Sequence, residues 1–336
     1  MTASGDPVLD IADVRVAFRE PGGWVEAVRG CSLAVEEGEI MGLVGESGCG
    51  KSVTALACLG LTPGAAKVSG RLRVCGTDVI NARESSLRSV RGGKAAMIFQ
   101  NPMAAMNPFI SIGRQLSDAI TCHRPLSRRQ ATGAAVEALA SVHLPDPELV
   151  LVKYPHELSG GQLQRVMIAM ALSCAPRLLI ADEPTTALDV TVQAQVLMLI
   201  RELAREHGLT ILFITHDLGV VATICDKVSV MYAGQVVEQA GVHDLFERPR
   251  HPYTSKLLRT VPRIGGGADA LSSIPGTVPD PRSPIPGCAF AGRCDASTET
   301  CRQTMPRPSN DDGRHMVRCH HALAGRPDPE PAERLS

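Results

Sequence analysis

Residues 45–52 read GESGCGKS and match the phosphate-binding pattern G-x-x-x-x-G-K-[ST]. An apolar run, EIMGLVG at 39–45, precedes the motif, and VTALACLG at 53–60 follows it with an apolar helical face. In such a strand–loop–helix unit, successive backbone N–H groups surround a phosphate at the helix N-terminus. We expect Lys51 to reach the β- and γ-phosphate oxygens and Ser52 to bind Mg²⁺. An ordinary glycine turn is the alternative, which the flanking strand and helix disfavour.

The expected contacts to ATP come from the loop backbone and from the first turn of the following helix. They are Gly45, Ser47, Gly48, Cys49, Gly50, Lys51, Ser52 and Val53. Glycines suit such a loop because they let the backbone approach a phosphate closely.

Two further apolar runs end in polar residues of the kind that a phosphate loop needs. RLLIADE at 177–183 ends in Asp182 and Glu183, and TILFITHD at 210–217 contains His216. We expect Asp182 to hold Mg²⁺ and Glu183 to activate the attacking water as a general base. His216 would orient that water and contact the γ-phosphate. A solvated strand end is the alternative for Asp182 and Glu183, and a plain surface or packing residue is the alternative for His216. The phosphate loop makes both the weaker interpretations.

The alternation of short apolar runs with helical patterns predicts an α/β fold with a mostly parallel sheet. Between the second and third runs, apolar residues recur at helical spacing and Gly208 stands where a helix C-cap would, which predicts a β–α–β unit. These apolar residues are Val192, Val196, Ile200 and Leu203. Residues 100–158 show helical segments without a convincing strand, which predicts a helical insertion.

Residues 158–165 read LSGGQLQR and look like a second phosphate-binding turn. Ser159 is placed to cap a helix that begins near Gly160 and Gly161. The turn has neither a lysine nor a preceding strand. A capped helix N-terminus with glycines that allow close approach suits a phosphate that is already held elsewhere.

Six motifs in this order resemble those of an ABC-type ATPase: GESGCGKS, Gln100 in MIFQNP, LSGGQLQR, LLIADEP, ALDV at 187–190 and ITHD. The resemblance covers about residues 8–260. It implies a RecA-like P-loop core with an antiparallel β subdomain and with a helical subdomain at about 101–165. It also implies that Gln100 takes part in catalysis and in binding Mg²⁺.

The same resemblance implies that the LSGGQ turn binds the nucleotide of a second subunit, so that two chains would share each ATP. The residues that would act in trans are Ser159, Gly160, Gly161, Gln162 and Asp189. The family places an aromatic platform for adenine at the end of the first strand. Phe18 is the candidate, with Trp24 and plain core packing as alternatives.

Finer resemblance is to the ATPase subunits of oligopeptide/dipeptide (peptide/nickel) importers, and to the first of the two paired ATPases in those systems. It rests on residues 97–116, KYPHELSGG at 153–161, ERPRHPYTSKLL at 247–258 and residues 274–294. It implies ATP hydrolysis that powers import of peptides or a related small solute. The implied partners are two transmembrane permease subunits, a second, paralogous ATPase and, indirectly, an extracytoplasmic solute-binding protein. The chain would lie peripherally on the cytoplasmic face of the cell (inner) membrane.

Four of the eleven cysteines follow the pattern C-x5-C-x6-C-x17-C: Cys288, Cys294, Cys301 and Cys319. Their segment has few apolar residues, so a metal would supply a missing constraint on its fold. Four thiolates suit zinc or an iron–sulfur cluster, and the lack of close C-x2-C pairs favours iron. Resemblance to importer ATPases with the same pattern implies a [4Fe–4S] cluster. Zinc and free thiols are the alternatives, and His315, His320 or His321 could replace a cysteine ligand.

These patterns predict an ATPase domain at 1–262, a small cysteine-rich extension at 263–321 and a disordered tail at 322–336. The net charge of −1 and the 3% of aromatic residues argue against nucleic acid as a partner. No window approaches the roughly 20 apolar residues of a membrane helix, so no transmembrane segment is expected. A soluble ABC ATPase acting on DNA or ribosomes is one alternative, but long coiled coils and a second cassette are missing. An exporter ATPase is another, which the C-terminal segment opposes.

Overall fold

The computed structural model describes residues 6–186, 188–260, 273–310 and 313–323. Within them an eight-stranded sheet forms the centre of the molecule, in the order β11–β12–β10–β9–β3–β8–β7–β6. The five strands from β9 to β6 are parallel, and the other three are antiparallel to their neighbours. The bounds are β3 (Ile40–Val44), β6 (Ala95–Ile98), β7 (Leu178–Asp182), β8 (Thr210–Thr215), β9 (Lys227–Tyr232), β10 (Gln235–Gly241), β11 (Ser309–Asn310) and β12 (Met316–Val317).

The three strands predicted from apolar runs, β3, β7 and β8, are confirmed. Every residue in them is buried, as expected for parallel strands that are covered on both faces. The predicted β–α–β unit is also present, because β7 and β8 are parallel neighbours joined by α8 (Val190–His207). Gly208 caps α8 in the left-handed region, with φ of 60°.

A second sheet is antiparallel and has the order β2–β1–β4–β5. Its strands are β1 (Leu9–Glu20), β2 (Gly23–Val35), β4 (Lys67–Val74) and β5 (Thr77–Asp78). One apolar cluster joins this sheet, α1 (Lys51–Cys58) and one face of the central sheet. α2 (Glu84–Val90) adds Leu87 and Val90 to the same cluster.

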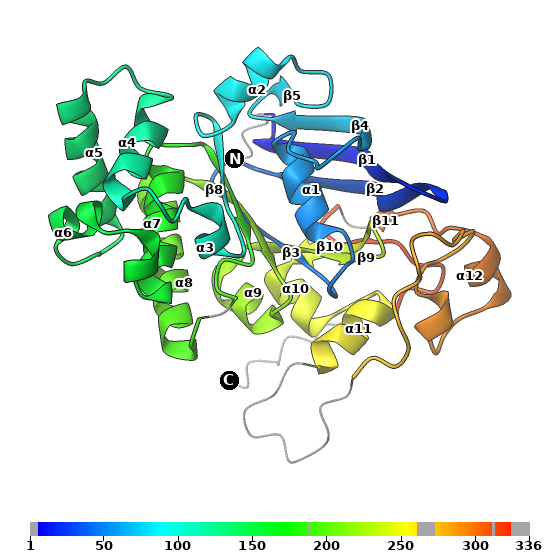
Figure 1. The fold of residues 1–336 in the computed structure, drawn as a ribbon. Helices are drawn as coiled ribbons and strands as arrows, with labels where there is room; N and C mark the ends of the chain where they lie inside the picture. Colours follow the sequence, from blue (N-terminus) through cyan, green and yellow to red (C-terminus); the bar gives the residue numbers. More distant parts are fainter. Residues whose placement is uncertain (1–5, 187, 261–272, 311–312, 324–336) are drawn as a thin grey trace, which may run out of the picture.

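The helices between β6 and β7 gather on one side of the molecule, away from the antiparallel sheet (Figure 1). They are α3 (Pro102–Ala105), α4 (Ile112–Thr121), α5 (Arg128–Ser141), α6 (Pro147–Val152), the 3₁₀ turn η1 (Pro155–Glu157) and α7 (Gly160–Leu172). The helical insertion was expected over residues 101–165, and its last helix continues to Leu172. Buried residues of α7 and α8 share one apolar cluster with this helical group and with the other face of the central sheet.

The C-terminal segment packs against the central sheet. After α9 (Leu218–Ile224), α10 (Val242–Glu247) and α11 (Pro252–Arg259), the chain forms η2 (Ala291–Arg293), α12 (Glu299–Gln303) and the β11–β12 pair. Because β12 pairs with β10, the pair extends the central sheet. Phe290 is buried against Tyr232 and Tyr253.

Two expectations fall outside the described residues. The boundary between 262 and 263 lies in the stretch 261–272, and most of the expected tail lies in 324–336. In the part of the chain that the structure does describe, no helix has the length and apolar character needed to cross a membrane.

Candidate functional site

The phosphate loop, residues 45–52, connects the carboxyl end of β3 to α1 and has glycines where its backbone is left-handed. The angle φ is 155° at Gly45, 78° at Gly48 and 103° at Gly50. A Cβ atom at Gly45 would collide with the carbonyl oxygen of Met231. α1 begins without a side-chain cap. Backbone N–H groups of its first turn therefore remain available to a phosphate.

Lys51 is held at the loop by main-chain acceptors. Lys51 is only 5% exposed. Its Nζ donates to the carbonyl oxygen of Gly45 at 2.8 Å and to that of Glu46 at 3.0 Å. Burial raises the pKa of the neighbouring Cys49 thiol, an effect that the Lys51 charge partly offsets. Cys49 is therefore a neutral, buried residue of the loop.

Of the three residues expected to hold Mg²⁺, Ser52 and Asp182 form an oxygen-donor pair, while Gln100 donates to Glu183 and its contact with Mg²⁺ stays a prediction. Ser52 Oγ donates to Asp182 Oδ1 at 3.1 Å, which joins α1 to the end of β7. Burial raises the pKa of Asp182, the hydrogen bond from Ser52 opposes this rise, and the neighbouring Glu183 charge adds to it. A hydroxyl and one carboxylate suit Mg²⁺, which usually completes its shell with phosphate oxygens and water. The two residues therefore fit the expected cation.

Glu183 follows β7 with a left-handed backbone, φ 47°, and is anchored by its N–H, which donates to the carbonyl oxygen of Ile214 at 2.9 Å. Its Oε2 accepts from Gln100 Nε2 at 2.8 Å and from Thr186 Oγ1 at 2.9 Å. Its Oε1 lies 3.1 Å from Nδ1 of His216. Three segments far apart in the chain thus converge on one carboxylate.

The electrostatics of this carboxylate suit a general base. Burial raises the pKa of Glu183, but hydrogen bonds from His216 and Thr186, together with the charges of His216 and Lys51, outweigh burial and lower it below the ordinary value. Glu183 is therefore ionised at neutral pH, the form that can accept a proton from water. Gln100, Glu183 and His216, three predicted catalytic residues, belong to one network.

The turn at residues 158–162 opens α7 with a complete capping box. Ser159 Oγ accepts from the Gln162 N–H at 3.3 Å, and Gln162 Oε1 accepts from the Ser159 N–H at 3.1 Å. Ser159 and Gly160 are exposed, whereas a Cβ at Gly161 would lie 2.6 Å from Cγ1 of Val192 in α8. Among the described residues, no hydrogen bond or ion pair joins this turn to the phosphate loop. The turn presents a helix N-terminus to the outside of its own chain.

Asp189 and Phe18 have roles within the chain. Asp189 caps α8, because its Oδ1 accepts from the Val192 N–H at 3.0 Å. Phe18 is partly buried against the cluster under the antiparallel sheet. Trp24, paired with the residue next to Phe18, is 42% exposed and has Lys67 Nζ 4.0 Å from its ring centroid. The expected contact of Asp189 across a dimer and the choice of adenine platform stay predictions.

The four C-terminal cysteines, Cys288, Cys294, Cys301 and Cys319, line one small cavity. His251 also lines it and is buried. Its Nδ1 accepts from the Tyr253 N–H at 3.0 Å, and its Nε2 has no hydrogen-bond partner among the described residues. Burial lowers the pKa of His251 to about 4, so the ring is neutral at pH 7. An unpartnered buried nitrogen beside thiols is compatible with a bound group in this cavity.

The expectation of a metal centre gains no further support. Over the ranges that the structure describes, no three His, Cys, Asp or Glu side chains are placed to hold a metal ion. His315, named as a substitute ligand, instead contacts Glu238 Oε1 at 2.7 Å in the central sheet and does not line the cavity. His320 and His321 do line it.

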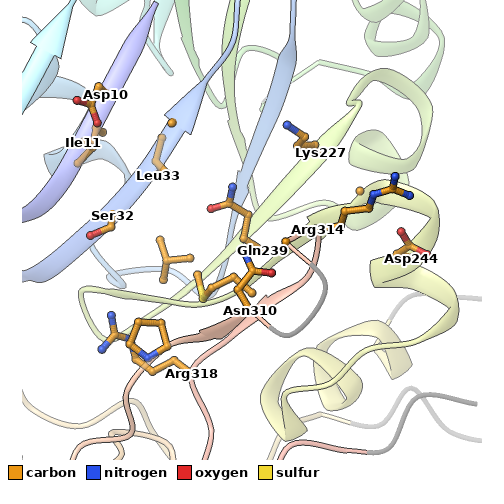
Figure 2. Close-up of a pocket in the computed structure, with 16 residues that line it drawn as sticks. Asp10, Ile11, Ser32, Leu33, Lys227, Gln239, Asp244, Asn310, Arg314 and Arg318 are labelled. Atoms are coloured by element: carbon orange, nitrogen blue, oxygen red, sulfur yellow. The ribbon is translucent and has the colours of Figure 1, made fainter. Parts of the chain in front are cut away.

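A second cavity, of about 700 Å³, lies between β1, β2, β10 and the β11–β12 pair (Figure 2). It contains none of the predicted site residues and reaches Lys227, at the amino end of β9, whereas the phosphate loop follows the carboxyl end of the parallel strand β3. Three of its charged residues are already in ion pairs: Asp10 with Arg71, Lys227 with Glu39, and Asp244 with Arg248. We assign no ligand to this cavity.

Three residues around the phosphate site were missed by sequence reasoning. Thr186 donates a hydrogen bond to Glu183. Its position three residues after Glu183 was the one feature of the sequence that could have indicated this contact. Tyr253 Oη accepts from the Glu46 N–H at 3.0 Å, and Arg293 pairs with the Glu46 carboxylate. Neither has a local sequence signal, because each comes from a remote part of the chain.

Comparison with protein-family models gives two matches. The ABC transporter model matches residues 28–186, and the model of the oligopeptide/dipeptide transporter C-terminal region matches residues 237–301. The first range contains the phosphate loop, Gln100, Asp182 and Glu183, whereas His216 follows it. The second contains three of the four cysteines and Arg293.

Similar curated proteins match over almost the whole chain. A "Probable peptide ABC transporter ATP-binding protein" of Sinorhizobium fredii is 49% identical, covering 94% of this chain and 95% of that protein. A "Probable D,D-dipeptide transport ATP-binding protein" of Escherichia coli is 48% identical, covering 93% and 96%. A "Dipeptide transport ATP-binding protein" of Bacillus subtilis is 45% identical, covering 94% of each.

Solved structures share the fold. An ATP-binding cassette in a dimeric post-hydrolysis state with ADP and Pi aligns with a TM-score of 0.62 and 25% identity, covering 70% of this chain and 98% of that one. A single subunit of that structure therefore has the same fold as the aligned 70% of the present chain.

Proposed function

The chain belongs to the ATP-binding subunits of ABC transporters that have the oligopeptide/dipeptide transporter C-terminal region, and from this we propose that it hydrolyses ATP to power import of peptides or a related small solute. Peptide transport is named for the three relatives above. The exporter and the soluble DNA or ribosome alternatives find no support in these relatives.

The observation that carries the proposal is the arrangement around Glu183. A subunit that only binds ATP needs the phosphate loop, whereas hydrolysis also needs a base for water. Glu183 is ionised and held by Gln100, Thr186 and His216, and it directly follows the Asp182 that contacts Ser52. ATP and Mg²⁺ would thus meet a positioned base at the ends of two adjacent strands, β7 and β8.

We further propose that the active unit contains two ATPase chains. The Ser159–Gln162 turn is a helix N-terminus that, within the described part of the chain, has no hydrogen bond or ion pair to its own phosphate loop, and it suits the γ-phosphate held by a partner. A dimer of a similar cassette has been solved with ADP and Pi. The partner would be a paralogous ATPase, and the present chain would be the first of the pair.

The exposed apolar residues near Gln100 support docking on membrane permeases. Phe109 is 88% exposed and Met103 44% exposed in the segment that follows Gln100, and Val152 of α6 is 70% exposed. Large apolar side chains at the surface mark sites of protein contact. Two permease subunits, on the cytoplasmic face of the cell membrane, would cover this surface, and a binding protein outside would deliver the solute.

The four cysteines are proposed ligands of a [4Fe–4S] cluster. Their common cavity and the unpartnered His251 Nε2 support this proposal. Anaerobically purified protein would be brown with about four irons per chain. Zinc without iron would contradict the cluster.

The transport proposal is tested by a mild-detergent pull-down of the tagged chain from its own membranes. Two permease subunits and a second ATPase should co-purify, and ATPase activity should rise when the cognate binding protein and its solute are added. Co-purified ribosomes or DNA, without any membrane partner, would overturn the transport function.

A further inference from the structure

Arg293, in η2 of the C-terminal segment, forms a two-pronged ion pair with Glu46 of the phosphate loop. Its NH1 group lies 2.8 Å from Glu46 Oε2, and its NH2 group lies 3.1 Å from Glu46 Oε1. A planar guanidinium that meets both carboxylate oxygens fixes the orientation of each partner. The side chain of Arg293 is only 7% exposed, so water screens this pair weakly.

All five N–H groups of the Arg293 guanidinium have acceptors. NH1 also donates to Tyr232 Oη at 3.2 Å, NH2 to the carbonyl oxygen of Ile274 at 3.0 Å, and Nε to that of Pro275 at 3.0 Å. The main chain of Arg293 is fixed as well, because its carbonyl oxygen accepts from Lys256 Nζ at 2.9 Å. Arg293 is therefore a rigid support.

Glu46 is the part of the phosphate loop that this support holds. Its N–H donates to Tyr253 Oη at 3.0 Å, and its carbonyl oxygen accepts from Lys51 Nζ at 3.0 Å. The carboxylate is held by Arg293. Three different groups of one loop residue are thus fixed, and one of the three contacts involves the lysine expected to reach the phosphates.

We propose that Arg293 is a positioning residue for the nucleotide: through Glu46 it holds the phosphate loop and Lys51 in the shape that binds ATP. Affinity for nucleotide then depends on the C-terminal segment, although Arg293 follows Glu46 by 247 positions in the sequence. The proposal rests on the nucleotide site of the proposed function and is independent of the transported solute.

The test is the binding of Mg²⁺ and a fluorescent ATP analogue to the isolated full-length chain, with ATPase kinetics of the assembled transporter. Arg293→Gln should raise the Kd, and the KM for ATP, about tenfold while kcat changes less than about twofold, because the loop holds the phosphates in both the ground state and the transition state. Arg293→Lys should give a smaller rise, since lysine keeps the charge but lacks the planar fork.

Glu46→Gln tests the same link from the other side. It should also raise the Kd, and the Arg293→Gln/Glu46→Gln double variant should bind no more weakly than Arg293→Gln alone, because both changes remove one interaction. If Arg293→Gln does not fold, the Kd values of Arg293→Lys and Glu46→Gln still test the positioning role of Arg293.

Arg282→Gln is the matched control. Arg282 lies in the same C-terminal segment and pairs with Glu20 of β1 at 2.8 Å, but this pair is exposed and does not touch the phosphate loop. The Kd should stay at the wild-type value. A lower melting temperature with an unchanged Kd in both the Arg293 and Glu46 variants would overturn the positioning role. A wild-type chain that binds no nucleotide would overturn the proposed function itself.

Discussion

At the scale of single residues, Glu183 combines two properties that one group rarely has. It is held in a strained, left-handed backbone, and its carboxylate is stabilised in the charged form by three side-chain donors. Strain is tolerated where the surroundings fix the conformation, as they do here. A small change in these donors should therefore alter chemistry more than stability.

Glu183→Gln should lower ATP turnover by at least about 100-fold, because an amide cannot accept the proton of the attacking water. ATP binding should remain, since the phosphate loop and Ser52 are untouched, and the ATP-bound dimer should accumulate. Turnover by the assembled transporter and size-exclusion chromatography with ATP measure the two effects. Wild-type turnover in the variant would remove Glu183 from the mechanism.

Thr186→Val should shift the acidic limb of the pH–activity profile to higher pH. Its hydroxyl donates to Glu183 Oε2 and helps to hold the pKa of Glu183 below the ordinary value, so removing it raises that pKa. Activity needs the ionised carboxylate, so it is lost as the pH falls through the pKa of Glu183. Because this pKa is higher in the variant, the variant loses activity at a higher pH than the wild type does. The profile of kcat/KM against pH provides the measurement. Thr132→Val serves as the control, because Thr132 is an exposed residue of α5 whose hydroxyl donates to the carbonyl oxygen of Arg128. Equal profiles for both variants would contradict this link.

At the scale of elements, α5 and α7 offer a matched pair of helix starts. Each has a complete capping box, Ser127 with Gln130 and Ser159 with Gln162. Ser127→Ala and Ser159→Ala should each cost about 1 kcal/mol of helix stability. Only Ser159→Ala should also lower ATP turnover, because only that helix start is proposed to face a nucleotide. Thermal melts and turnover separate the two effects; equal losses of turnover would assign Ser159 a capping role alone.

The elements also show how much of the fold could be predicted from the sequence alone. β3, β7 and β8 are predictable because strands buried on both faces read as continuous apolar runs ending in polar residues. The convergence of Glu183 and His216 follows from those strand ends. β11 and β12 could not be predicted, because each has two residues and no periodicity, and their pairing depends on β10. Arg293 could not be linked to Glu46, because the two are 247 positions apart.

At the scale of the whole molecule, no hydrogen bond or ion pair among the described residues joins the phosphate loop of a chain to its own LSGGQ turn. The isolated chain should therefore bind ATP with Mg²⁺ but hydrolyse it slowly. Turnover per chain should rise with protein concentration, or on addition of the paralogous ATPase, as two-chain sites form. Sedimentation and turnover measured over the same concentration range test this. Turnover per chain that stays constant where only monomers sediment would contradict a shared site.

The link between Arg293 and Glu46 also has a consequence for how the protein is made. During translation the phosphate loop leaves the ribosome long before its support does, since 247 positions separate the two residues. At about 5–20 residues per second, the delay is roughly 12–50 s. An incomplete chain that ends before Arg293 therefore has the phosphate loop but lacks the support that gives the loop its full affinity for ATP. ATP is therefore held firmly only after synthesis has passed Arg293, the residue that supports the loop.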